Sequence, residues 1–171
     1  MDFALVILRF LHVVLGAYWA GVILFTALYL EPSVRAAGPA GGQVMGQLVA
    51  RGHMTVMPII ALITILSGVD LLRRVSGGFS PVWMGSRMGI AISIGAIAAI
   101  LAFVIGVIVM RPATLKVMTL TQAAMQPPEG PAGDAQLAAL APLRRRVTLM
   151  MRLVAALLAV AITTMAVARY L

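Results

Sequence analysis

Four apolar segments occupy most of this 171-residue chain, and each is close to the length that crosses a lipid bilayer. They cover residues 3–29, 54–72, 88–110 and 147–168. A hydrocarbon core of about 30 Å requires roughly 20 helical residues, because each residue adds about 1.5 Å. Hydrocarbon offers no hydrogen-bond partner to the backbone, so each segment must pair its own amide groups as an α-helix. The sequence therefore predicts an all-α, four-helix transmembrane bundle in a single domain.

The composition supports a membrane protein and excludes several kinds of site. Hydrophobic residues make up 62% of the chain and charged residues only 11%, which is more apolar surface than a soluble core of this size needs. There is no cysteine, so disulfides, zinc–thiolate sites and cysteine-ligated iron–sulfur clusters are excluded. The net charge of +8 comes from basic residues in expected loops and helix ends, a pattern typical of contact with anionic lipid headgroups rather than nucleic acid. We expect the lipid bilayer as a partner, together with other membrane subunits or further copies of this chain.

Proline residues predict where the helices end. Pro32 predicts the end of the first helix and Pro112 the end of the third, because proline disrupts a helix interior. Residues 113–143 are then expected to form an interfacial segment, and residues 43–53 to extend the second helix. Four spans place both termini on one side. The other side carries more arginine and lysine, so the positive-inside rule predicts periplasmic termini in a bacterial inner membrane.

The third apolar segment carries small residues at four-residue spacing, which allows helix backbones to approach closely. They form two rows, the first of Ala91, Gly95 and Ala99, and the second of Ala98, Ala102 and Gly106. We therefore expect this segment to be the central packing helix of the bundle.

His12 lies within the first apolar segment, where a polar ring needs a partner and is a candidate for function. Gly16 lies one turn further on the same face and leaves room for a flat macrocycle or for a neighbouring helix. Met165 is expected at a comparable depth, so a His/Met pair would suit haem iron. Arg9 would meet a haem propionate or pair with Asp70. The alternative for His12 is structural, with its ring bonded to a hydroxyl or a backbone carbonyl of another helix.

The first helix also carries a family resemblance. Leu11-His12 is followed seven to nine residues later by Trp19 and Gly21, and then by Glu31-Pro32. This pattern resembles the first helix of small bacterial membrane proteins of the CopD-like and DUF2269-like kind, and is similar to that of HemJ-type haem membrane proteins. The resemblance implies a b-type haem, or copper, bound through the first-helix histidine in an electron-transfer system. The third and fourth helices lack histidine, which departs from bis-histidine haem ligation.

His53, the other histidine, is expected at the opposite membrane boundary, about 20 Å from His12 at helical rise, so one metal cannot bind both. His53 and Met57 share a helix face, and imidazole with thioether suits Cu(I). Several of the chain's 12 methionines are expected at the same boundary, namely Met54, Met57, Met110, Met150 and Met151. The pattern predicts a metal site at His53 and Met57, or else methionines that fill gaps in an apolar bundle.

No enzyme signature is visible, since the chain has no paired carboxylates, no glycine-rich phosphate loop and no Ser/His/Asp set. Every acidic residue is expected at a helix end or in a loop. Two function classes remain. The first is a haem- or copper-binding protein of an electron-transfer system, and the second is a non-catalytic accessory subunit that packs within a larger membrane complex.

Overall fold

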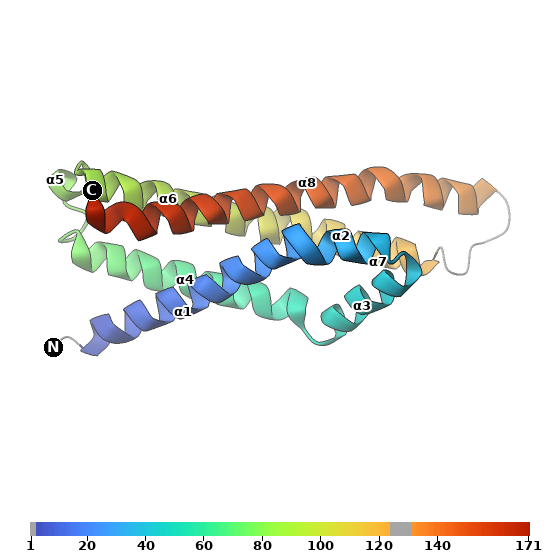
Figure 1. Cartoon of the computed structure of the whole chain (residues 1–171), viewed down its shortest axis with the longest axis horizontal. Helices are drawn as coiled ribbons and strands as arrows, with labels where there is room; N and C mark the ends of the chain where they lie inside the picture. Colours follow the sequence, from blue (N-terminus) through green and yellow to red (C-terminus); the bar gives the residue numbers. More distant parts are fainter. Residues whose placement is uncertain (1–2, 124–130) are drawn as a thin grey trace.

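The computed structural model describes residues 3–123 and 131–171. It is an elongated bundle in which α1 begins and α8 ends at the same end (Figure 1). Every regular element within the described residues is a helix, which confirms the all-α prediction. The α-helices are α1 (Phe3–Phe25), α2 (Glu31–Ala36), α3 (Pro39–Ala50), α4 (His53–Val75), α5 (Pro81–Met84), α6 (Arg87–Val104), α7 (Arg111–Ala123) and α8 (Pro131–Val167). Two π-helical turns, η1 (Thr26–Leu30) and η2 (Ile105–Met110), and a terminal 3₁₀ turn, η3 (Ala168–Tyr170), complete the order.

Four stretches of helix are long and apolar enough to cross a membrane. They are Phe3–Ala36, His53–Val75, Arg87–Thr121 and Leu140–Tyr170. Only 17% to 28% of the most apolar window of each stretch is buried inside the bundle. The remaining large hydrophobic side chains point outward, where water would make them costly and lipid would not. The fold is therefore that of a multi-pass membrane protein.

Two of the predicted helix ends were wrong, and the reason is the same at both. The helix continues past Pro32 into α2 because η1 directly precedes it, and past Pro112 into α7 because η2 directly precedes it. Proline lacks an N–H, and its ring would clash with the carbonyl four residues earlier in a regular α-helix. A π turn holds an extra residue and displaces that carbonyl, so the helix absorbs the proline without ending.

The same effect changes the predicted interfacial segment. Residues 113–123 continue the third spanning helix as α7, instead of forming a separate surface helix. Residues 124–130 lie outside the described part of the chain, and residues 131–143 are already the first turns of α8.

The second correction concerns α3, which was expected to extend α4. Gly52 lies between them with φ of +84°, a left-handed conformation that glycine adopts without steric cost. This residue ends α3 and starts α4 in a new direction. The α2–α3 hairpin is closed by Gly41, where a Cβ atom would lie 2.0 Å from the Val34 carbonyl oxygen.

The four spans pack as two antiparallel pairs, α1 with α4 and α6 with α8, rather than around one central helix. Gly95 lets α6 approach α8 closely, since a Cβ atom there would lie 2.6 Å from Thr164 Oγ1 and 3.1 Å from the Ala161 carbonyl oxygen. Gly106 belongs to the second predicted row of small residues, and a Cβ atom there would meet nothing within 4 Å. The pairs meet in a small core formed by Trp19, Ala20, Ile23, Ala27, Ala61, Ala102, Val154, Ala155 and Leu158.

This packing predicts different tolerance at two neighbouring positions of α6. Gly95→Leu should lower the free energy of unfolding by about 1–3 kcal/mol or prevent folding, because the new side chain must displace α8. Ile97→Leu, at a residue that is 58% exposed, is the matched control and should have little effect. Thermal unfolding in detergent measures both, and equal melting temperatures for the two variants would contradict the close α6–α8 contact.

Candidate functional site

A cavity of about 140 Å³ lies beside the core, between the two helix pairs. It is located at the first two turns of α4, the end of the bundle where α2, α3 and α7 also lie. Most of its surface is apolar. Its hydrophobic walls include Trp19, Ile23, Leu30, Ala61, Ala102 and Phe103. A ready-made apolar cavity with a few polar groups is the usual form of a small-ligand site.

The cavity forms where three of the four spans depart from regular α-helix. Both π-helical turns, η1 and η2, contribute lining residues, and so does Pro58 within α4. Such irregular turns are frequent at functional sites, because they redirect side chains and loosen packing. Ala102 and Gly106 supply too little volume to fill the resulting space.

Sulfur-containing side chains surround this cavity. Four methionines that the sequence placed near His53 line it together with that histidine, namely Met54, Met57, Met110 and Met151. Met150 is not among the lining residues. Met45 of α3 is an additional one, which the sequence analysis missed because α3 was not expected to fold back over the site. The thioethers come from α3, α4, η2 and α8, so only the tertiary fold brings them together.

Two charged residues also line the cavity, and each directly precedes one of the two prolines that follow a π turn. Glu31 accepts hydrogen bonds from Arg35, one turn further along α2, and from the Thr148 hydroxyl of α8 at 2.8 Å. Arg35 also donates to the Thr148 hydroxyl oxygen at 2.6 Å. Arg111 is the other charged lining residue. The sequence analysis had placed Glu31 at a helix end, whereas the structure places it within a continuous helix that packs on α8.

His12 contacts α4 and does not line the cavity. Its Nδ1 atom donates to the Thr64 backbone carbonyl at 2.8 Å, and its ring lies so close to Gly68 that a Cβ atom there would be 2.6 Å from Cε1. The space beside Gly16 is taken by Thr64, whose Cγ2 atom would lie 3.3 Å from a Cβ atom at Gly16. The sequence left open whether a flat macrocycle or a neighbouring helix lies beside Gly16, and in the structure the neighbouring helix α4 lies there. In metal sites, a histidine often donates one ring N–H to a carbonyl in this way while its other ring nitrogen binds the metal.

The expected haem ligands are held in different helix pairs. Met165 packs at the α6–α8 contact, where its Cγ atom would lie 3.0 Å from a Cβ atom at Gly95. His12 is fixed against α4, and Arg9 is an exposed residue of α1. This arrangement does not fit a haem held between His12 and Met165. Haem at His12 stays a prediction from the resemblance.

The two histidines lie at different levels of α4. Thr64, the partner of His12, follows His53 by eleven residues, or roughly 16 Å along the helix. One metal therefore cannot bind both imidazoles, as the sequence predicted.

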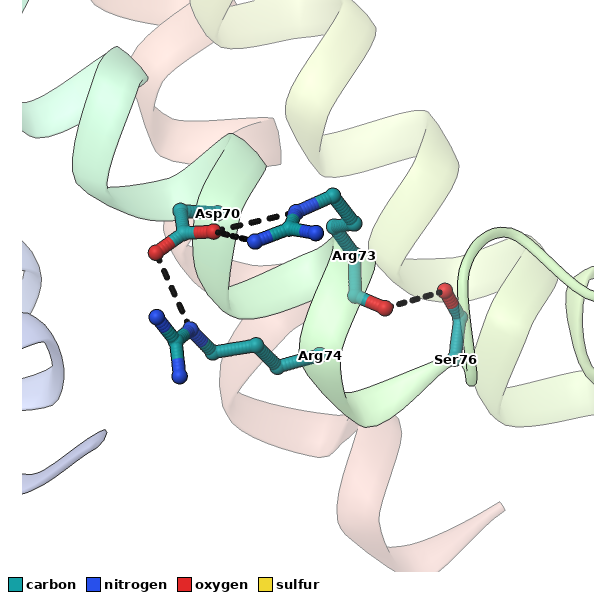
Figure 2. A network of polar contacts seen from close by, with 4 residues as sticks. All are labelled: Asp70, Arg73, Arg74 and Ser76. Carbon is teal, nitrogen blue, oxygen red and sulfur yellow. Dashed lines mark hydrogen bonds and ion pairs between the residues drawn. The ribbon is translucent and has the colours of Figure 1, made fainter. Parts of the chain in front are cut away.

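Asp70 is located at the opposite end of α4 and pairs within its own helix (Figure 2). Its Oδ1 atom accepts from Arg73 Nη2 at 2.8 Å and its Oδ2 atom from Arg74 Nε at 3.0 Å. Neighbours three and four residues away on a helix reach each other without tertiary structure. The predicted pair of Asp70 with Arg9 was therefore wrong, because nearer arginines occupy both carboxylate oxygens.

Comparisons with protein-family models, curated proteins and solved structures find no match to this chain. Within the residues that the structure describes, no three histidine, aspartate or glutamate side chains form a group that could hold a metal ion.

The contact of His12 with α4 predicts a coupled pair of substitutions. Gly68→Ala should destabilise the protein by about 1–3 kcal/mol, because the new methyl group overlaps the His12 ring. His12→Ala should remove that overlap, so the double variant His12→Ala/Gly68→Ala should be more stable than additive losses predict. Chemical denaturation of the four proteins in detergent measures the coupling. Additive free-energy changes would show that the ring does not lie against Gly68.

Proposed function

We propose that this protein is a membrane-bound component of an electron-transfer or copper-handling system that binds Cu(I) through His53 and Met57. The observation that carries the proposal is the convergence of five thioethers and one imidazole on one cavity. Cu(I) is a soft cation that prefers sulfur and imidazole ligands. His53 and Met57 lie one turn apart at the start of α4, so they are the natural first pair.

The remaining methionines complete the donor set from other elements. Met54 follows His53 directly, and Met110 and Met151 line the cavity from η2 and α8. The apolar walls keep water away from these sulfur atoms. Glu31 and Arg35 hold α2 against α8 through Thr148 and so fix the far wall. When bound, copper would supply a one-electron redox couple, whereas the chain supplies the ligands and the dry surroundings.

The alternative explanation is that these methionines only fill gaps between helices, as methionine often does in apolar cores. The cavity favours the metal-binding explanation. Methionines that served only as filler would close the space they surround, and here a volume of about 140 Å³ remains open among them.

We propose further that the end of the bundle with the cavity faces the cytoplasm of a bacterial inner membrane, with both termini in the periplasm. That end carries Arg35, Arg51, Arg111, Lys116, Arg144, Arg145 and Arg146. The other end carries Arg73, Arg74, Arg87 and Arg169. An excess of basic residues near the ends of the spans is typical of the cytoplasmic side.

This orientation predicts which positions a membrane-impermeant thiol reagent reaches in spheroplasts. The chain has no cysteine, so single substitutions give no background. Val82→Cys, in α5 at the terminal end and 87% exposed, should be labelled in intact spheroplasts. Arg145→Cys, in α8 at the other end, should be labelled only after permeabilisation. The reverse pattern would invert the orientation, and labelling of both from outside would contradict the single span, Arg87–Thr121, that separates the two positions.

The copper site predicts a specific loss of Cu(I) affinity. The purified protein should bind one Cu(I) in competition with a chromogenic chelator under reducing conditions. His53→Ala and Met57→Leu should each weaken binding about tenfold or more, because each removes a donor atom. Met118→Leu and Met165→Leu are matched controls, since neither side chain lines the cavity. Absorption spectroscopy at the copper edge should show sulfur and nitrogen neighbours, and equal losses in all four variants would refute the site.

A further inference from the structure

Thr26 is a buried hydroxyl that the fold leaves without a partner. Its side chain is only 5% exposed and lines the cavity from the first position of η1. No hydrogen bond to this hydroxyl occurs among the described residues. The other buried hydroxyls in the described part are each bonded, with Thr64 and Ser67 donating to carbonyl oxygens one turn earlier.

An unpaired hydroxyl in an apolar interior is costly, and native structures nearly always satisfy it. Because the Thr26 side chain borders the open volume, the missing partner has room inside the cavity. The partner must bring an oxygen or nitrogen atom that accepts a hydrogen bond.

The size of the cavity indicates how large that partner is. A cavity of about 150 Å³ lined by apolar side chains holds a benzene ring, and this one measures about 140 Å³. Trp19 and Phe103 line the cavity and supply aromatic rings that can pack against a flat ligand, and methionine sulfur atoms make favourable contacts with aromatic rings. A ligand with a single six-membered ring therefore fits this volume. The volume is larger than one metal ion needs.

The polarity of the walls restricts the ring further. A charged ring would lose its hydration to walls that are mostly apolar and whose two charged residues, Glu31 and Arg111, have opposite signs, so a net charge on the ring is disfavoured. A plain hydrocarbon ring would leave the Thr26 hydroxyl unpaired. An uncharged ring that carries a carbonyl oxygen meets both requirements.

Access to the cavity suits a lipid-soluble molecule. The cavity is only partly enclosed, and the outside of the spans carries large apolar side chains that lipid would cover. We therefore expect the ligand to be one that dissolves in the bilayer around the spans.

From these observations we propose that the cavity binds a lipid-soluble quinone headgroup, with a carbonyl oxygen accepting a hydrogen bond from Thr26 Oγ1. The quinone would share the cavity with the proposed copper ligands, but its hydrogen bond would involve Thr26, and a hydroxyl is a poor ligand for a soft metal such as Cu(I). It goes beyond the proposed function by giving the protein an organic ligand of the class that carries electrons in membranes.

Fluorescence of Trp19 provides a direct measurement. The chain has two tryptophans, and Trp83 is located in α5 outside the cavity. In a Trp83→Phe background, duroquinone (tetramethyl-1,4-benzoquinone) should quench Trp19 saturably in detergent. Durene, the hydrocarbon of the same shape without carbonyl oxygens, should compete more weakly.

Thr26→Val removes the hydroxyl at nearly constant volume. Duroquinone affinity should fall about three- to tenfold, the value of one hydrogen bond, whereas durene affinity should stay unchanged. Unchanged duroquinone affinity in this variant would overturn the proposal, and would leave water as the partner of Thr26. The variant keeps every methionine and His53, so its Cu(I) affinity should equal that of the unsubstituted protein. The two measurements therefore test the quinone proposal and the copper proposal independently.

Gly106→Leu tests the volume. A Cβ atom at this lining position would meet nothing within 4 Å, so we expect the leucine side chain to extend into the cavity. The variant should fold and bind both duroquinone and durene at least about tenfold more weakly. Gly21→Leu is the matched control, because a Cβ atom there would also meet nothing within 4 Å, and Gly21 is not among the residues that line the cavity. Saturable quenching that survives Gly106→Leu would place the ligand elsewhere and overturn the proposal.

Discussion

The structure depends on one constraint, that a backbone amide surrounded by hydrocarbon must find its hydrogen-bond partner within its own helix. Proline cannot meet this requirement alone, and the chain places Pro32, Pro58 and Pro112 in or beside its spans. It keeps the helices continuous with π-helical turns before the first and the last of these. Departures from regular helix at membrane depth are tolerated where protein surrounds them. Here the irregular turns line one cavity. The turns that accommodate the prolines therefore also create the candidate site.

The cavity also results from different roles of the small residues at two levels of the third span. Near the terminal end of the bundle, Gly95 lets α6 and α8 touch closely. About three turns further on, Gly106 also lacks a side chain, but a Cβ atom there would have no close neighbour. Small residues therefore act in opposite ways at the two levels, bringing helices together at one and leaving open volume at the other. Thr148, with Glu31 and Arg35, then fixes α2 to α8 beside that volume.

Sequence patterns predicted most of the methionines that line the cavity, but they did not predict the shape of the cavity or all of its lining residues. The gathering of Met54, Met57, Met110 and Met151 near His53 followed from helix lengths, because depth in a membrane is set by rise per residue. Met45 and Thr26 did not follow, since one depends on α3 folding back and the other on a π turn. The Arg9–Asp70 pair failed because depth alone cannot tell which of several arginines is nearest.

The sequence by itself determined the class of the protein, four spanning helices with both ends on one side, because hydropathy and length are local properties of each segment. It also determined that His12 and His53 lie at different levels. Only the tertiary structure decided how the helices pair, that the helices continue past Pro32 and Pro112, and that His12 meets Gly68. These outcomes depend on side chains from separate helices competing for the same space. Such competition is settled by packing in three dimensions, which no periodicity along one chain records.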